Sequence, residues 1–520
     1  MRKIITSLLK SNVSHLYKSA EETRRNKMNI ASVLNQEHKN TPLISILIIA
    51  ASAPLFAADF DGNIVLGAPT GTSITANVLT ATNQDVYLSF GTQSGDYSDR
   101  TLASNFSGGE PDEIHLTGLQ PDTRYYYQLN YNEGGSSFLA TEELSFHTPR
   151  KKGSSFVFGV QGDSHPERAP RDFIPELYER TLNQAKNDGV EFYLTTGDDF
   201  SVDRNYPGGI TEDDVIERYR IQRPWLGAVG NEAPVFLVNG NHEQAALYLY
   251  NDARKYPAPD NPAVWAQNAR NEYFTQPEPN DFYTGSSKEI EFIDKGLTGT
   301  YFSFEWGDAL FVIVDPFWSS EVVVDNLFEG PPGEAGEVFK TPNKWDISLG
   351  DDQYNWLKQT LENSDAKFKF IFSHLLHGVR RGGVEGLNLY EWGGEGRDGN
   401  YEFDTERPTW DKPLHQLMVD TDVSIYFHAH DHVWVKQVLD GVVYQEVSSP
   451  ADKDYELAKW VTAYTDDSSV IRPNTGYTRV SVSPEQVQVD YVRTYLPEDE
   501  NQDQINGEVA YSYIIDARDD

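Results

Sequence analysis

The chain has 520 residues and a formal net charge of −37 at pH 7, from 43 lysines and arginines against 80 aspartates and glutamates, and it contains no cysteine. A chain of this length is expected to form about two or three domains. The acidity argues against nucleic acid as a partner, because the protein's field would repel it. The absence of cysteine excludes disulfides and thiolate metal sites, which leaves oxygen and imidazole ligands for any metal.

Residues 1–58 are predicted to be a leader. An apolar run from Leu43 to Ala53 is followed by small residues at Ala57 and Ala58. This pattern is typical of a signal-peptide core with its cleavage site, and the run is shorter than the roughly 20 residues that span a bilayer. We therefore expect export, to the periplasm or the medium, with a membrane anchor as the alternative. No later stretch is long and apolar enough to span a membrane.

Residues 59–150 show short alternating runs separated by Gly, Asn, Asp and Pro. This pattern predicts a small antiparallel β-sandwich. The run Leu119-Gln120-Pro121-Asp122-Thr123-Arg124-Tyr125 resembles the fibronectin type III module. In that module a Leu-x-Pro-x-Thr-x-Tyr run turns a corner, and the tyrosine hydroxyl holds it in place.

From residue 151 to 497 the pattern changes to strands that alternate with helices, which predicts an α/β layered core. Two late alternating runs, 477–482 and 487–492, are expected to be strands of the same domain. Residues 498–520 are predicted to be an acidic C-terminal tail. The other expected elements are strands at 156–161, 192–195, 235–238, 310–314, 367–372 and 423–427, and helices at 173–186, 213–226 and 352–361.

Five blocks of residues of the metal-ligand type follow the predicted strands. A single Gly-Asp pair usually marks only a turn, but five such blocks in series are hard to obtain from turns alone. In open α/β sheets, ligand sites lie outside the carboxyl ends of the strands. The blocks are Gly162-Asp163-Ser164-His165, Gly197-Asp198, Gly240-Asn241-His242-Glu243, His374 and Ala429-His430-Asp431-His432.

These five blocks, in this order, resemble the motifs of the calcineurin-like metallophosphoesterases, over about residues 155 to 450. The resemblance implies two divalent ions bridged by Asp198, and Mn, Zn, Fe or Ca would each suit oxygen and nitrogen ligands. It implies in-line attack on phosphorus by a metal-bound hydroxide, and makes His242 the histidine that contacts substrate or protonates the leaving oxygen. The implied ligands are Asp163, His165 and His432 for one ion, and Asn241, His374 and His430 for the other.

The chain departs from the family pattern at two places. Ala429 stands where the last motif has glycine, and the cost should be slight unless the position needs a positive φ. A fibronectin-like module before the catalytic domain is also similar to the purple acid phosphatases. Those enzymes use a tyrosine three residues after the bridging aspartate and lack the first-motif histidine, whereas this chain has Ser201 and His165. A purple Fe(III) enzyme is therefore not expected.

The loop after His374 supplies further candidates. Arg380, Arg381 and His377 could bind phosphate oxygens, although a solvated arginine pair is the alternative. The Gly-rich and aromatic-rich insert from Gly378 to Trp410 is predicted to be a long loop over the cleft that selects the substrate.

The fold class expected from these patterns is α/β, a layered β-sandwich metallophosphoesterase core with flanking helices, preceded by a small all-β fibronectin-like sandwich. The leading functional hypothesis is an exported binuclear metal-dependent phosphatase or phosphodiesterase acting on a small phosphoester. A nucleotidase or a phospholipid-directed phosphodiesterase is an alternative. An alternative from another class is a non-catalytic surface-binding protein that retains the fold.

Overall fold

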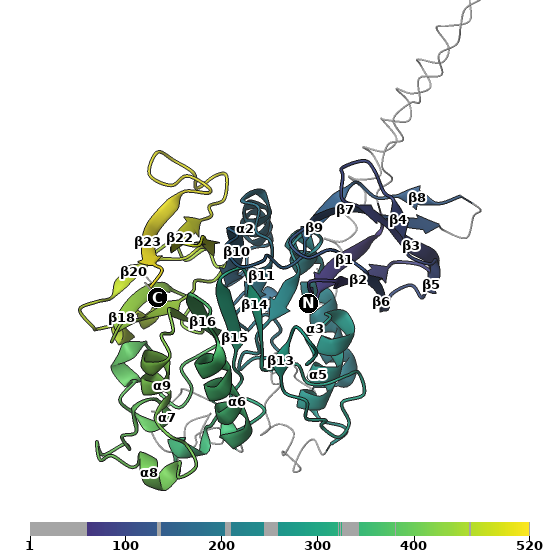
Figure 1. Ribbon diagram of the computed structural model, residues 1–520. Coiled ribbons are helices and arrows are strands. Elements are labelled where there is room, and N and C mark those ends of the chain that lie inside the picture. The colour runs from purple at the N-terminus through teal and green to yellow at the C-terminus, as the bar shows by residue number, and fades with distance from the viewer. Residues whose placement is uncertain are drawn as a thin grey trace, which may run out of the picture. The chain divides into compact units, whose positions relative to one another are not determined.

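The computed structural model describes residues 60–132, 137–202, 210–243, 258–320, 322, 324, 343–379, 381–456 and 459–518. The predicted leader lies outside these residues. Internal contacts group Ala57–Asp520 into one compact unit, drawn in Figure 1. Within the described ranges, no helix combines the length and the apolar character needed to cross a membrane. The predicted domain boundaries at 58, 150 and 497 stay predictions.

The N-terminal part is an antiparallel sandwich of two sheets. One sheet has the order β1 (Gly62–Gly67), β2 (Ser73–Thr80), β6 (Pro111–Thr117). The other is built around β3 (Gln84–Gly91) and β7 (Arg124–Asn132), with the short strands β4 (Asp99–Arg100), β5 (Ser104–Phe106), β8 (Leu139–Ala140) and β9 (Leu144–His147) at its edges. Buried and half-buried residues alternate along β3, as expected for a strand with one face on a core.

The tyrosine corner expected from the fibronectin-like run is present. The backbone N–H of Gln120 donates to Tyr125 Oη at 2.9 Å. Tyr125 is 5% exposed and stacks on Phe146, with ring centroids 5.6 Å apart. The predicted hydroxyl-to-backbone bond of this module is therefore confirmed.

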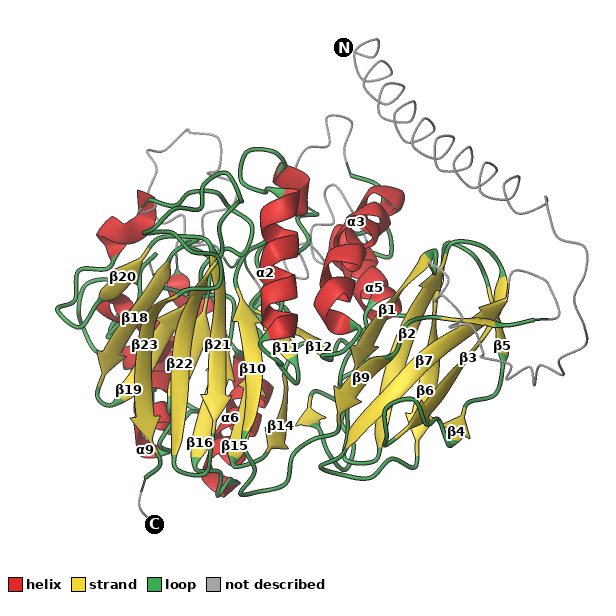
Figure 2. Ribbon diagram, turned by 90° about the horizontal axis from the view of Figure 1, so that it is seen from above, coloured by secondary structure: helices red, strands yellow, loops and turns green. Residues whose placement is uncertain are grey.

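The larger part contains two sheets, whose strands are labelled in Figure 2. The six-stranded sheet has the order β12 (Val235–Leu237), β11 (Tyr193–Thr195), β10 (Phe156–Gln161), β21 (Gly476–Val482), β22 (Gln486–Arg493), β23 (Val509–Asp516). The eight-stranded sheet has the order β13 (Thr284–Gly285), β14 (Phe302–Trp306), β15 (Ala309–Ile313), β16 (Phe368–Phe372), β17 (Ile425–His428), β19 (Val442–Glu446), β18 (Trp434–Leu439), β20 (Val470–Arg472).

An aromatic core joins the two sheets. Phe158 on β10 stacks on Phe192, with ring centroids 5.1 Å apart, and meets Phe311 on β15 edge-on, also at 5.1 Å. Phe370 and Phe372 on β16 belong to the same buried cluster. Full burial of one such side chain is worth about 1.5–3 kcal/mol relative to exposure, so this interface holds the two sheets face to face.

Helices cover the outer faces of both sheets. On the six-stranded sheet, α2 (Pro175–Asn187) and α3 (Glu212–Gly230) contribute to a cluster that contains Tyr193 and Val492, and α5 (Pro262–Tyr273) packs on α3. On the eight-stranded sheet, α6 (Gly350–Asn363) and α9 (Leu414–Asp420) pack against Val312 and Ile371. The order helices, sheet, sheet, helices confirms the predicted layered β-sandwich fold.

Two segments differ from the sequence expectation. Val509–Asp516 was assigned to an acidic tail but forms β23, antiparallel to β22. Its alternation of half-buried Tyr511, Tyr513 and Ile515 with exposed residues is a strand signal that the neighbouring acidic residues obscured. The insert 378–410 is predicted to be a long loop, but it contains α7 (Tyr390–Gly393) and α8 (Phe403–Glu406). Four of its aromatic side chains lie in the outer core, whereas Tyr401 is exposed; the four are Tyr390, Trp392, Phe403 and Trp410.

Candidate metal centre

The parallel strands bring the five motif blocks to one edge of the two sheets. Strands β10, β11 and β12 are parallel neighbours, and so are β15, β16 and β17. Their carboxyl ends therefore point the same way. Asp163, Asp198 and Asn241 follow the first three strands, while His374 and His430 follow β16 and β17.

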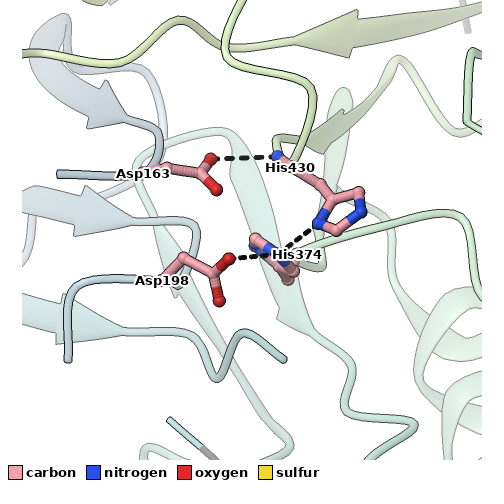
Figure 3. A group of neighbouring side chains, drawn as sticks. All are labelled: Asp163, Asp198, His374 and His430. Atoms are coloured by element: carbon pink, nitrogen blue, oxygen red, sulfur yellow. Dashed lines mark hydrogen bonds and ion pairs between the residues drawn. The ribbon is translucent and has the colours of Figure 1, made fainter. Parts of the chain in front are cut away.

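Four of the predicted ligands meet directly (Figure 3). Asp163, Asp198, His374 and His430 are buried, and each offers one ligand atom within 4.8 Å of the others. His374 Nε2 is central to the group. It lies 3.2 Å from Asp198 Oδ2, 3.1 Å from His430 Nδ1 and 3.0 Å from Asn241 Oδ1. The structure therefore places Asn241 with this group as well.

A second group shares Asp163 with the first. Asp163, His165 and His432 offer ligand atoms within 4.8 Å of one another. His432 Nε2 lies 3.4 Å from Asp163 Oδ1, and the rings of His165 and His432 stack with centroids 5.2 Å apart. A third overlapping group contains His165, Asp198 and His242. The seven predicted metal ligands are thus brought together, and the two aspartates connect the groups.

The polar atoms of these groups fit a cation better than they fit one another. Asp163 Oδ1 and His165 Nε2 are buried and lack a hydrogen-bond partner among the described residues. Buried polar atoms in folded proteins almost always have such a partner. Converging carboxylate, amide and imidazole atoms, two of them without a partner, are the donor set of a divalent-metal site.

The backbone at the ligands is held in an uncommon conformation. His165, Asp198, His430 and His432 all have positive φ, at 51°, 59°, 87° and 52°. Such residues cost about 1–3 kcal/mol each and persist where the surrounding structure imposes them, often at functional sites. Ala429 is not among the residues of positive φ, so the alanine in place of the family's glycine carries no backbone penalty.

Glu243 holds two of the loops together, a role that sequence reasoning did not identify. Its Oε2 accepts the N–H groups of Asp198 and Gly240 at 3.0 and 2.7 Å, and its Oε1 accepts that of Asp199 at 2.8 Å. The backbone at Gly240 packs so closely that an added Cβ would lie 2.2 Å from Asp198 Oδ1. The fourth position of the Gly-Asn-His-Glu block was the available signal.

The charges of the cluster favour a proton on His374 when no cation is present. Burial lowers the pKa of His374, but the nearby Asp198 carboxylate outweighs burial and raises that pKa to about 10. Burial, Arg381 and His374 together lower the pKa of His430. The proton therefore sits on His374 between the carboxylates, in the place where a cation would neutralise them instead.

His242 lies beside the cluster. Its backbone N–H donates to Asp198 Oδ1 at 2.8 Å, and its Nε2 lies 3.9 Å from Asp198 Oδ2. The side chain is 7% exposed. His242 is thus buried at the edge of the candidate ligands, and its contact with the substrate stays a prediction.

The predicted phosphate-binding residues have other contacts. Arg381 donates to the carbonyl of His430 at 3.0 Å and to Asp431 Oδ1 at 2.6 Å, which braces the loop of the last motif. His377 Nε2 lies 2.8 Å from Glu391 Oε2 of the packed insert and is outside the three ligand groups found among the described residues. Arg380 lies outside the described residues.

Two residues next to His165 were not predicted to act at the site. Ser201, which replaces the purple-type tyrosine, lies 3.0 Å from His165 Nδ1. Glu167 Oε1 lies 3.3 Å from the same nitrogen. Burial opposes ionisation of Glu167, but its contact with His165 outweighs burial and lowers its pKa to about 2. The spacing His-x-Glu in the first block was the signal for Glu167.

Two solved structures of phosphatases are similar to this chain in fold. PhoD is similar with a TM-score of 0.58 at 13% identity, covering 89% of this chain and 92% of that chain. A purple acid phosphatase from yellow lupin (Lupinus luteus) seeds is similar with a TM-score of 0.54 at 14% identity, covering 88% and 74%. At these identities the likeness shows the fold alone. No curated protein matches the chain in sequence.

The family itself is identified by sequence. Residues 156–434 match the family model of the calcineurin-like phosphoesterases. This range covers more than half of the chain and contains all five motif blocks. The chain therefore belongs to the calcineurin-like phosphoesterase family and is a metal-dependent hydrolase of phosphoric ester bonds.

Proposed function

We propose that this hydrolase is an exported binuclear phosphatase or phosphodiesterase. The observation that carries the binuclear assignment is the overlap of two groups of candidate ligands at Asp163. Each group by itself supplies at least three ligand atoms, so each can hold an ion of its own. Two ions a few ångströms apart are the arrangement that clamps the attacking and leaving oxygens in phosphoryl transfer.

Each ion has its own set of ligands in this proposal. Asp198 bridges the two sets, since its Oδ2 lies 3.2 Å from His374 Nε2 and 3.9 Å from His165 Nε2. Divalent ions bound there would act as Lewis acids on the phosphoryl oxygens and lower the pKa of a water ligand. The sets are Asp163, His165 and His432 for one ion, and Asn241, His374 and His430 for the other.

His242 is proposed as the residue that protonates the leaving oxygen. The bond from its backbone N–H to Asp198 Oδ1 fixes it beside the cluster. Histidine is the side chain that most often serves as a general acid in enzymes. Asn241 and Glu243, on either side of it, contact His374 and Asp198, and the His242 imidazole lies beside the same cluster, with Nε2 3.9 Å from Asp198 Oδ2.

The test is turnover of aryl phosphate monoesters and diesters by metal-free protein supplied with Mn²⁺, Zn²⁺, Fe²⁺ or Ca²⁺ in turn. We expect at least one ion to restore turnover, with two ions bound per chain. The preferred ester then separates phosphatase from phosphodiesterase. The proposal fails if no ion restores turnover of any ester.

A variant tests the bridging assignment. Asp198→Ala removes the carboxylate common to both sets and should abolish the binding of both ions as well as activity. Asp61→Ala, at an exposed position of the N-terminal sandwich, is the matched control and should behave as the wild type. Normal binding of two ions by Asp198→Ala would contradict the bridging role.

Export is proposed from the apolar run at residues 43–53 and the small residues that follow it. Fractionation of cells that express the full chain, with N-terminal sequencing of the product, tests this part. We expect the mature protein outside the cytoplasm with an N-terminus near residue 58. A product in the cytoplasm that retains the leader would contradict it.

A further inference from the structure

The two nitrogens of His165 face different surroundings. Nε2 is directed at the candidate ligands, 3.8 Å from Asp163 Oδ1 and 3.9 Å from Asp198 Oδ2. Nδ1 faces away from them, 3.0 Å from Ser201 Oγ and 3.3 Å from Glu167 Oε1. Both neighbours of Nδ1 can accept a hydrogen bond, so the proton of the neutral ring belongs on Nδ1. Nε2 then has a free electron pair directed at the cluster.

Glu167 is built into the wall of the site. It lies in the short turn η1 (Pro166–Arg168), and its side chain is 1% exposed. The same Oε1 that faces His165 lies 3.3 Å from Arg168 Nε. These two residues are its ion-pair partners in the part of the chain that the structure describes.

The carboxylate is poorly satisfied where it stands. Neither oxygen of Glu167 has a well-aligned hydrogen bond among the described residues. A buried carboxylate that serves stability alone is normally paired and fully hydrogen-bonded, since burying an unsatisfied charge is costly. The charge becomes favourable when a cation at Nε2 draws electron density from the ring and makes the proton on Nδ1 a stronger donor.

We infer that Glu167 is a positioning residue for the metal site. It orients the His165 ring together with Ser201 and raises the basicity of Nε2, as carboxylates commonly do for metal-binding histidines. This inference rests on the proposed function, because it assigns His165 to one of two ions. It predicts that Glu167 matters to one ion and not to the other, because the second set of ligands contains no contact with Glu167.

The test compares Glu167→Gln with wild type. Glutamine preserves the shape of the side chain and removes its charge. Glu176→Gln, the same change at an exposed position of α2, is the matched control. Titration calorimetry of metal-free protein with Mn²⁺ gives the affinity and stoichiometry, and thermal unfolding of the metal-free protein gives its stability.

We expect Glu167→Gln to bind one ion about 10–100-fold more weakly and the other ion with unchanged affinity. Metal-free Glu167→Gln should unfold at the same temperature as wild type or higher, because a buried charge has been removed. Glu176→Gln should match the wild type in both measurements. Ser201→Ala, which leaves the carboxylate in place, should weaken the same ion by a smaller factor.

Other outcomes overturn the inference. If Glu167→Gln binds both ions as the wild type does, Glu167 does not act on the site. If metal-free Glu167→Gln unfolds at a lower temperature and both ions weaken together, its role is structural. Ser201→Ala then provides an independent check. An unchanged metal affinity in this variant would show that the contacts at His165 Nδ1 do not affect the ion. If the wild type itself binds no ion, the proposed function fails. Failure of the inference about Glu167 alone leaves metal binding by the wild type intact, so the two outcomes are distinguishable.

Discussion

Gly240 is a position where even a methyl side chain should disturb the candidate metal site. The backbone of Gly240 lies against the loop that carries Asp198, and the two are tied by Glu243. A Cβ at this position would lie 2.2 Å from Asp198 Oδ1 and 2.3 Å from Asp198 N. The second of these atoms is backbone, so rotation of the Asp198 side chain alone cannot relieve the overlap. Gly240→Ala must therefore move one ligand loop relative to the other.

The size of the effect follows from this overlap. Ordinary contacts between heavy atoms are about 3.5–4 Å, so the loops must separate by more than about 1 Å. Overpacking of this kind costs about 1–3 kcal/mol of unfolding free energy. A displacement of about 1 Å in a catalytic site can cost about 100-fold in rate. We expect kcat/KM to fall by about that factor, together with loss of bound metal.

The assay is kcat/KM on an aryl phosphate with saturating metal, accompanied by metal analysis and thermal unfolding. Gly71→Ala is the matched control, because the nearest atom to its added Cβ is Pro121 Cγ at 3.6 Å, an ordinary contact. The control should keep full activity. Wild-type metal content and activity in Gly240→Ala would show that the loops are not rigidly coupled, and would refute this reasoning.

Two further outcomes are expected. The Asp198 carboxylate, acting against burial, raises the pKa of His374 to about 10, so a metal must displace the proton that His374 holds at neutral pH. Affinity should therefore increase as pH rises from about 6 to about 9, with release of protons on binding. Calorimetry in two buffers of different ionisation enthalpy measures the release, and a pH-independent affinity would contradict this assignment. Tyr125→Phe removes the bond from Gln120 N–H and should lower the unfolding free energy by about 1 kcal/mol without changing metal content. Thermal unfolding and metal analysis check this. An unchanged stability would show that the corner does not depend on the hydroxyl.

The sequence was informative about the ligands because they are local features of the chain. In each block a glycine or small residue precedes a ligand just after a buried strand. A few neighbouring residues are therefore enough to predict where the block lies in the fold. Parallel pairing of β10, β11 and β12, and of β16 with β17, then brings the ends together. The same locality made the fibronectin-like corner predictable, since Gln120 and Tyr125 are near neighbours in sequence.

Tertiary structure decided what the other polar residues do. Arg381 was a candidate for phosphate, but folding pairs it with Asp431, 50 residues away. Glu243 braces the loop of Asp198, 45 residues before it. The acidic residues near β23 obscured its strand pattern in the sequence, and the strand was identified only by its antiparallel pairing with β22. A side chain's partner depends on which elements pack together, and that information is spread over the whole chain. The ligands of this phosphoesterase could therefore be predicted from local sequence, whereas the residues that hold those ligands in place were identified only in the folded molecule.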